Sequence, residues 1–161
     1  MIEAVKLLIP LWSANVLVNI FYYFRRKYHF PDYPLDGNRL WFDGRPILGP
    51  AKTIFGLPVT LIGGYLGGVL VHLGNGWVSG LAVFLGAAAS GFFKRRLGLK
   101  RGEPLLFIDQ TDYLFMAYGL FFLSGEVIDT KTFLIALGIT IPVHVLANVI
   151  AYRLKIRETY W

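Results

Sequence analysis

The sequence of 161 residues contains no cysteine, which excludes disulfides, thiol chemistry and metal sites built on C-x-x-C motifs. Charged residues are also scarce, at 16% of the chain, whereas a soluble domain carries roughly 25%. Hydrophobic residues make up 55%, and the mean hydropathy is +0.54. A soluble fold of this length cannot enclose so much apolar surface. We therefore expect an integral membrane protein.

The N-terminal stretch lacks the marks of a cleaved signal peptide, because its positive region is weak and its apolar run has no small-residue cleavage site. We expect it to remain as a helix. The net charge of +6 is compatible with nucleic-acid binding. However, the basic residues lie in connections between apolar segments, where membrane topology explains them. We therefore expect no nucleic acid as a partner.

Five apolar segments of roughly 20 residues are each long enough to cross a hydrocarbon core of ~30 Å. They cover about Ile2–Phe24, Ile54–Leu73, Trp77–Phe93, Leu105–Leu123 and Thr132–Leu154. The predicted fold class is therefore all-α, a polytopic bundle of about five transmembrane helices that forms one domain over residues 1–161. Its two long polar connections cover about residues 25–53 and 94–104.

Lysine and arginine predict the orientation of this bundle. All of the 16 except Lys6 and Lys131 lie in the two long connections and the C-terminal tail. They are Arg25, Arg26, Lys27, Arg39, Arg45, Lys52, Lys94, Arg95, Arg96, Lys100, Arg101, Arg153, Lys155 and Arg157. The positive-inside rule places these regions in the cytoplasm. We expect a multi-pass plasma-membrane protein with its N-terminus outside, its C-terminus cytoplasmic and its functional site facing the cytoplasm; its oligomeric state stays open.

Small residues predict close helix packing. Gly63-Gly64 and Gly67-Gly68 form two overlapping G-x-x-x-G pairs, which let helix backbones approach closely. Gly86 and Ser90 have the same spacing on the next segment. We interpret all of them as packing positions without chemistry.

Two carboxylates interrupt the fourth apolar segment. Asp109 and Asp112 lie three residues apart and therefore share one face of a helix. Acids inside a span usually mark a functional site, and two oxygen ligands suit Mg²⁺ with substrate phosphates. The alternative is that the pair lies near the cytoplasmic end and forms salt bridges with the basic connection.

Both basic connections carry features of phosphate binding. Residues 43–53 combine glycines with Arg45, Lys52 and Thr53 directly before a helix, so that exposed backbone N–H groups, a helix N-terminus and cations coincide. Lys94, Arg95 and Arg96 follow the third segment. The alternative for such runs is topology signalling and contact with anionic lipid.

Polar residues also occur at helical spacing in the first and last segments. Asn15 and Asn19 lie four apart, as do His144 and Asn148, and interhelical hydrogen bonding is the alternative to a functional role. Together these features lead to the hypothesis that cations and a metal bind a nucleoside triphosphate at the cytoplasmic face, while the helices admit a lipid phosphate from the bilayer.

The sequence resembles the archaeal CDP-archaeol synthases, relatives of the CDP-diacylglycerol synthases. The resemblance covers most of the chain and rests on the order of several short motifs. They are Pro10 with Ala14-Asn15, Pro34-Leu35-Asp36, the run DGRPILGPAKTIFG from Asp43 to Gly56, Lys94-Arg95-Arg96-Leu97-Gly98, Pro104, Asp109-Gln110 with Asp112, and Pro142 with His144, Asn148 and Tyr152.

The resemblance implies a Mg²⁺-dependent cytidylyltransferase that joins CTP to the isoprenoid lipid 2,3-di-O-geranylgeranylglyceryl phosphate and releases pyrophosphate. It implies Asp109 and Asp112 as metal ligands, with Lys52 and Lys94 completing the catalytic set. The implied nucleotide- and phosphate-binding residues are Asp43, Gly44, Arg45, Gly49, Lys52, Thr53, Lys94, Arg95 and Arg96. Asn15, His144 and Asn148 would serve the lipid phosphate or the structure.

The chain departs from the family pattern at one place. The family has Gly-Asp at the eighth and seventh positions before Lys94, and a serine three positions before it, where this chain has Gly86-Ala87 and Gly91. The missing acid would be a metal ligand. Two other functions stay open: a phosphatidyltransferase that uses a CDP-lipid, of whose motif Asp43-Gly44-Arg45 is a fragment, and a transporter or channel with an ion path through His72, His144 and the aspartates.

Overall fold

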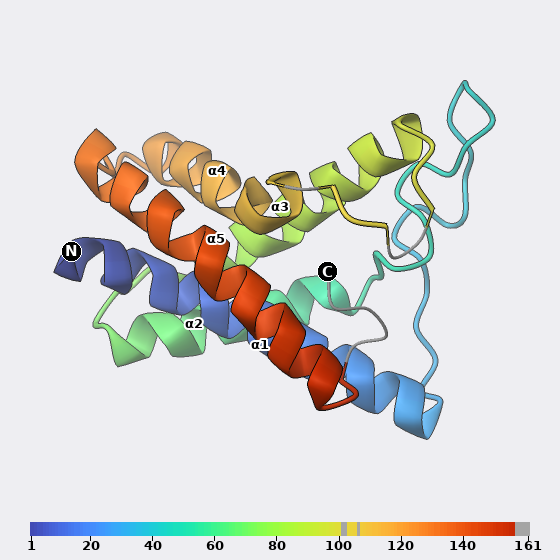
Figure 1. Cartoon of the computed structure of the whole chain (residues 1–161), viewed down its shortest axis with the longest axis horizontal. Coiled ribbons are helices and arrows are strands. Elements are labelled where there is room, and N and C mark those ends of the chain that lie inside the picture. The colour runs from blue at the N-terminus through green and yellow to red at the C-terminus, as the bar shows by residue number, and fades with distance from the viewer. Residues whose placement is uncertain (101–102, 106, 157–161) are drawn as a thin grey trace.

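The computed structural model describes residues 1–100, 103–105 and 107–156, and the described part is mainly helical. Its helices are α1 (Ile2–Tyr28), α2 (Gly56–Leu70), α3 (Gly76–Arg96), α4 (Ile108–Leu123) and α5 (Thr130–Arg153) (Figure 1). The predicted all-α class and the five helical segments are thereby confirmed. Arg101, Leu106 and Arg157, which fall within the predicted charge pattern and the fourth segment, lie outside the described residues.

Helix lengths divide the five helices into two groups. Among the described residues, α1, α3 and α5 are long and apolar enough to cross a membrane. The α2 helix has 15 residues and α4 has 16, so at 1.5 Å per residue each extends only ~22–24 Å. The α4 helix begins at Ile108, three residues later than predicted. The number of membrane crossings stays a prediction.

The basic regions gather at one end of the bundle, on the right of Figure 1. Arg26 near the end of α1 donates a hydrogen bond of 2.6 Å to the carbonyl of Ile156 after α5. Arg45 of the first connection donates to the carbonyl of Arg96 at the end of α3, at 2.6 Å. The two connections and the end of α5 are therefore neighbours, as the charge pattern requires.

The glycines of α2 allow contact with two helices at once. Gly63 and Gly67 face α1, where a Cβ on Gly63 would lie 2.7 Å from the Cα of Ala14. Gly64 faces α3, where a Cβ would lie 2.4 Å from the backbone nitrogen of Gly80. Distances this short leave no room for a side chain. The predicted packing role of the G-x-x-x-G pairs is therefore confirmed.

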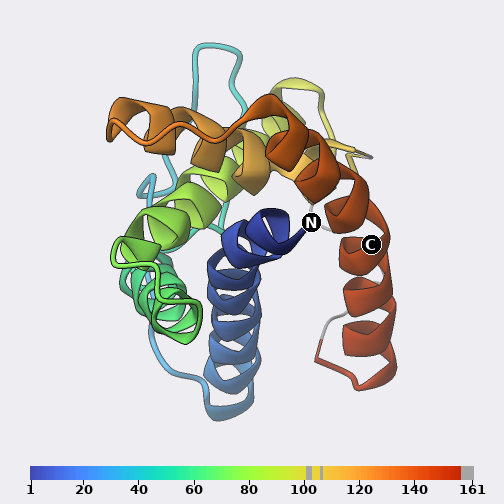
Figure 2. The same cartoon turned by 90° about the vertical axis from the view of Figure 1, so that its left-hand side faces the viewer.

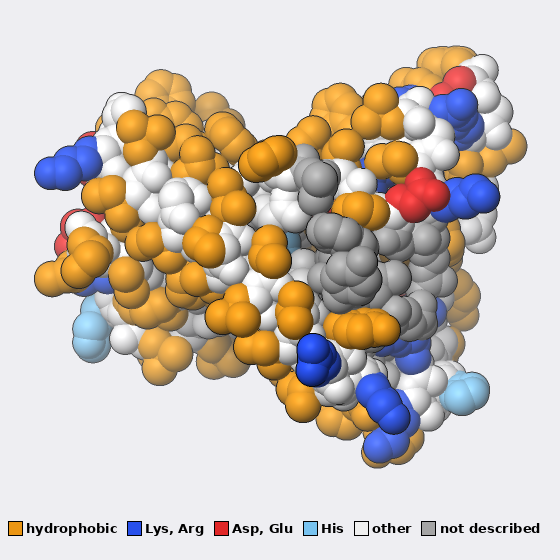
Figure 3. All heavy atoms as spheres, in the orientation of Figure 1, with side chains coloured by type: hydrophobic (Ala, Val, Ile, Leu, Met, Phe, Trp, Pro, Cys, Tyr) orange, Lys and Arg blue, Asp and Glu red, His pale blue; other side chains and the backbone are white. Residues whose placement is uncertain are grey.

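The α1 helix is the central element. Viewed from the end, it lies inside an arc formed by the other four helices (Figure 2). Its Leu8, Leu11 and Ala14 are completely buried. The α5 helix lies at the periphery and buries only Ala136, Thr140 and Asn148 among its described residues. Hydrophobic side chains cover much of the outer surface of the helices (Figure 3), as expected for a surface that faces lipid.

The α2–α3 contact predicts that Gly80→Ala destabilises the protein. A Cβ there would lie 2.2 Å from the carbonyl oxygen of Thr60, and overpacking of this kind costs roughly 1–3 kcal/mol. The midpoint of thermal unfolding in detergent should fall. The matched control is Gly138→Ala in α5, where nothing lies within 4 Å of the added Cβ and the midpoint should hold or rise. Equal midpoints for the two variants would contradict the packing.

Candidate functional site

A cavity of about 260 Å³ lies at the end of the bundle where the basic connections gather. The predicted site residues in its lining fall into three chemical groups. The cations are Lys52, Lys94 and Arg95, the carboxylates are Asp109 and Asp112, and the other polar side chains are Asn15, His144 and Asn148. Folding therefore brings together residues that are up to 133 positions apart in the sequence, from Asn15 to Asn148.

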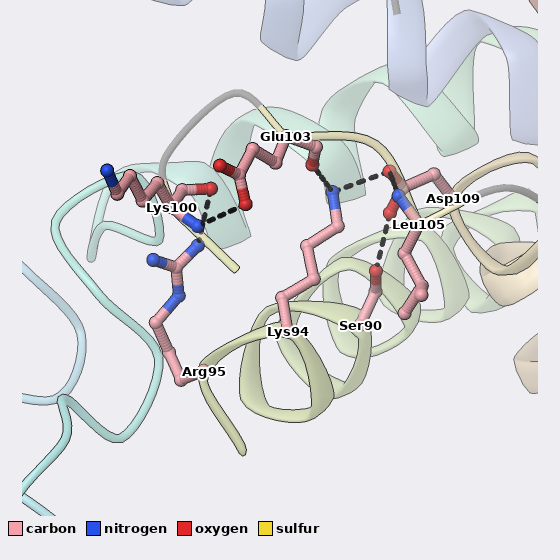
Figure 4. Close-up of polar contacts among 7 residues, drawn as sticks. All are labelled: Ser90, Lys94, Arg95, Lys100, Glu103, Leu105 and Asp109. Atoms are coloured by element: carbon pink, nitrogen blue, oxygen red, sulfur yellow. Dashed lines mark hydrogen bonds and ion pairs between the residues drawn. The ribbon is translucent and has the colours of Figure 1, made fainter. Parts of the chain in front are cut away.

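Asp109 is held by three donors (Figure 4). Lys94 Nζ donates to its Oδ2 at 2.5 Å, the Leu105 backbone nitrogen donates to the same oxygen at 2.9 Å, and Ser90 Oγ donates to Oδ1 at 2.8 Å. Lys94 also donates to the carbonyl of Glu103 at 3.0 Å. These contacts join the last turns of α3 to the first turn of α4. The salt bridge that the sequence offered as an alternative is thus present at Asp109.

Asp112 lies one turn further along α4, and its carboxylate also lines the cavity. The shared face predicted for the two aspartates is therefore confirmed. Gly86 of α3 allows this arrangement, because a Cβ there would lie 2.7 Å from the backbone nitrogen of Tyr113. Both Lys52 and Lys94 are close enough to act on the Asp112 carboxylate electrostatically.

Lys52 reaches the cavity by crossing α3 at a glycine. A Cβ on Gly91 would lie 3.2 Å from Lys52 Cε, so the missing side chain leaves the path that the lysine follows. Its backbone is fixed on both sides by the segment before it: Leu35 N donates to the Lys52 carbonyl at 2.7 Å, and Ile54 N donates to the Tyr33 carbonyl at 3.0 Å. The lysine therefore extends from an ordered loop.

Two backbone N–H groups of the glycine-containing loop before Lys52 donate to a side chain of the same connection. The backbone N–H groups of Leu48 and Gly49 both donate to Asp36 Oδ2, at 2.8 and 3.0 Å. The expectation that exposed N–H groups of this loop would bind phosphate is therefore wrong for these two groups. The sequence predicts no such role for Asp36, because an acid twelve residues before its partner leaves no local pattern.

Burial acts to raise the pKa of Asp36, but hydrogen bonds from the backbone of Leu48, Gly49 and Asn38 outweigh it, so this pKa lies below its ordinary value of 3.8. A pKa that is lower in the folded than in the unfolded state contributes stability above the unfolded value. That contribution is lost as the pH falls through the lowered pKa of the folded protein. At neutral pH the ionised carboxylate therefore supports the loop.

Several predicted phosphate-binding residues lie outside the cavity lining and hold the connections together instead. Arg45 Nη1 donates to the carbonyls of Arg95 and Arg96, at 3.2 and 2.6 Å. Arg96 forms a salt bridge of 3.1 Å with Asp43. Three other predicted phosphate-binding residues also lie outside the lining. Gly44 and Gly49 have positive φ, and Thr53 is buried and shares a hydrogen bond of 3.0 Å with Tyr22.

The other polar residues of the cavity come from two helices, α1 and α5. Asn19 donates to the side-chain oxygen of Asn15 at 2.8 Å, so this hydrogen bond lies within α1, whereas the alternative drawn from the sequence was a bond between helices. His144 of α5 packs its ring edge-on to Tyr113 of α4, with 6.0 Å between centroids. Tyr22 lines the cavity beside these residues, although no pattern in the sequence marks it as a site residue.

The donor set of the cavity fits a magnesium ion. Over the described ranges, no group of three or more histidine, aspartate or glutamate side chains forms a candidate metal cluster. Asp109 and Asp112 thus offer one or two carboxylates, which is what Mg²⁺ takes when waters and substrate phosphates complete its shell. Ala87, at the position where an acid was expected, also lines the cavity and contributes only a methyl group.

Comparison with known proteins identifies the relatives of this chain. The family model for CarS-like CDP-archaeol synthase matches residues 68–161. A CDP-archaeol synthase from Hyperthermus butylicus is 32% identical over 99% of this chain and 96% of its own length. One from Sulfurisphaera tokodaii is 35% identical over 80% of this chain and 81% of its own. One from Methanopyrus kandleri is 36% identical over 80% and 79%.

A solved structure has the same fold. It is described as an intramembrane enzyme for archaeal membrane lipid biosynthesis, and its TM-score with this chain is 0.76. The two are 28% identical, and the match covers 92% of this chain and 94% of the other. The likeness supports a multi-pass membrane protein.

The contacts of Asp36 predict that Asp36→Asn loosens the loop before Lys52. Hydrogen bonds to charged groups contribute roughly 1.5–3 kcal/mol, so hydrogen exchange at the amides of Leu48 and Gly49 should accelerate about tenfold or more. Asp129→Asn, at the start of α5, is the matched control and should leave these amides unchanged. Unaltered exchange in Asp36→Asn would mean that the carboxylate does not hold the loop.

Proposed function

The chain belongs to the CDP-archaeol synthase family, and we propose that it joins CTP to 2,3-di-O-geranylgeranylglyceryl phosphate in the synthesis of archaeal membrane phospholipids. The observation that carries this proposal is the cavity in which Lys52, Lys94 and Arg95 meet Asp109 and Asp112. It combines cations for a triphosphate with carboxylates for a metal, at the end of a bundle whose outer surface suits lipid.

The reaction balances as a nucleotidyl transfer. An oxygen of the lipid phosphate forms a bond to the α-phosphorus of CTP, and the bond from that phosphorus to the oxygen bridging to the β-phosphate breaks. The products are CDP-archaeol and pyrophosphate. Such a transfer depends on positioning and charge neutralisation more than on covalent catalysis. Lys52, Lys94 and Arg95 would neutralise the triphosphate and the leaving pyrophosphate.

Asp109 and Asp112 would hold Mg²⁺, which when bound supplies positive charge to the phosphate oxygens. Asp112 is the better placed of the two, because Asp109 already accepts hydrogen bonds from Ser90, Lys94 and Leu105.

The remaining predicted residues would either position the residues that bind phosphate or contact the lipid substrate. The residues that would hold the connections carrying Lys52 and Arg95 are Asp43, Gly44, Arg45, Gly49, Thr53 and Arg96. Asn15, His144 and Asn148 would face the lipid phosphate, because they line the cavity from α1 and α5.

The proposed topology has five crossings, an outer N-terminus, a cytoplasmic C-terminus and a site that faces the cytoplasm from the plasma membrane. The gathering of the basic regions at one end of the bundle supports it. The α2 and α4 helices are shorter than a typical hydrocarbon core, and local thinning of the bilayer can accommodate such helices at modest cost.

Membership of the family favours the cytidylyltransferase over the two alternatives from the sequence. A phosphatidyltransferase would consume a CDP-lipid, and a transporter would release no pyrophosphate. For an ion path, His72 and His144 would have to be connected, yet they line two separate cavities at different places in the bundle.

The site predicts that Asp112→Asn and Lys52→Ala each lower CTP-dependent pyrophosphate release by roughly 100-fold or more, because each removes charge that the transferring phosphates need. The assay uses purified protein in detergent with the unsaturated ether-lipid phosphate. Matched controls are Asp129→Asn and Lys6→Ala, which make the same chemical changes at residues lining the other cavity and should keep their activity. Full activity in both site variants would reject the assigned site.

The carboxylate pair predicts dependence on a divalent cation. Removal of metal with EDTA should abolish pyrophosphate release, and excess Mg²⁺ should restore it. The reason is that the carboxylates of Asp109 and Asp112 repel phosphate unless a cation lies between them. Retained activity in EDTA would show that the two acids serve another role.

A further inference from the structure

The first connection contains an ordered hairpin whose apolar residues have no role in the proposed reaction. Leu40 and Pro46 form an isolated antiparallel bridge. Trp41 N donates to the Arg45 carbonyl at 2.7 Å, and Ile47 N donates to the Arg39 carbonyl at 3.0 Å. We call this segment hairpin 39–47. It projects beyond the end of α3, at the upper right of Figure 1.

Hairpin 39–47 carries three adjacent exposed apolar side chains at and beside its tip. The Phe42 side chain is 97% exposed, that of Leu40 62% and that of Trp41 42%. Three adjacent large apolar residues on a projecting turn are unusual in contact with water and indicate an interaction surface. Arg39 at the base of the hairpin is exposed as well.

The hairpin packs against the last apolar turn of α3. The Trp41 ring packs edge-on against Phe92, with 5.4 Å between centroids, and lies 5.0 Å from the Phe42 ring. Phe92 and Phe93 are the last apolar residues of α3 before its basic end, and Phe93 is 55% exposed. The exposed apolar surface of α3 therefore continues into the hairpin.

Arg96 holds the hairpin in this place. Its Nε lies 3.1 Å from Asp43 Oδ2, and its Nη2 donates to the Pro46 carbonyl at 2.7 Å. Its guanidinium also lies over the Phe92 ring, 4.9 Å from the centroid. Contacts with the end of α3 therefore fix the position of the exposed apolar residues of the hairpin.

We propose that hairpin 39–47 is a membrane anchor whose Phe42 and Leu40 enter the headgroup boundary of the leaflet that α3 leaves. Tryptophan and tyrosine concentrate at this boundary, phenylalanine and leucine of interfacial segments bury in it, and arginines beside it attract anionic lipid phosphates. The occupant is the bilayer and not a second protein, because the apolar surface is continuous with a membrane helix. The anchor depends on the chain lying in a membrane and is independent of the proposed reaction.

The chain contains only four tryptophans, which makes an intrinsic fluorescent probe practical. The probe is Phe42→Trp in a chain whose four native tryptophans are replaced by phenylalanine. The protein is reconstituted in vesicles of phosphatidylcholine and phosphatidylglycerol, with and without bromine on the upper acyl carbons. Lys100→Trp in the same background is the control, since Lys100 is exposed on the other basic connection.

Brominated lipid should quench the fluorescence of the Phe42→Trp chain roughly twofold or more, in line with an aromatic side chain at the interface, whereas the Lys100→Trp control stays near its value in plain vesicles. Aqueous acrylamide should quench the control more strongly. Equal behaviour of the two chains, with free access of acrylamide to both, would overturn the anchor and leave the tip as a surface for a soluble partner. Pyrophosphate release in the Phe42→Trp chain, measured separately, reports on the reaction alone.

Discussion

The ion pair between Lys94 and Asp109 is the contact on which the arrangement of the site depends. A carboxylate within an apolar segment is costly unless it is partnered, and here the partner is the first basic residue at the end of α3, at 2.5 Å. Because Lys94 lies near the end of one helix and Asp109 near the start of the next, the pair joins α3 to α4. Asp112, one turn later, is then directed into the cavity.

A second requirement is that the first connection be rigid. Asp36 accepts hydrogen bonds from the backbone N–H groups of Leu48 and Gly49, and the backbone nitrogen of Leu35 donates to the carbonyl of Lys52. Arg45 ties the same connection to the end of α3 by donating a hydrogen bond to the carbonyl of Arg96. The charged residues of the two connections thus divide into those that face the cavity and those that fix the loops, and the second group keeps the first in position.

Local patterns in the sequence predict much of this structure. Apolar runs predict the five helices, the glycine spacing predicts the contacts of α2, and the three-residue spacing of Asp109 and Asp112 predicts their common face. The contacts of Asp36 and Arg45 could not be predicted, since they join segments twelve and about fifty residues apart. For the same reason the sequence indicates only a packing role for Ser90, although it donates to Asp109.

The central claim is that the cations and carboxylates of the cavity bind the triphosphate of CTP together with a metal. The most direct test is the thermal midpoint of the purified protein in detergent with CTP or CMP, each with and without Mg²⁺. We predict a clear rise with CTP that requires Mg²⁺ and little change with CMP, which lacks the two outer phosphates. Equal shifts with CTP and CMP, or none with either, would contradict the claim.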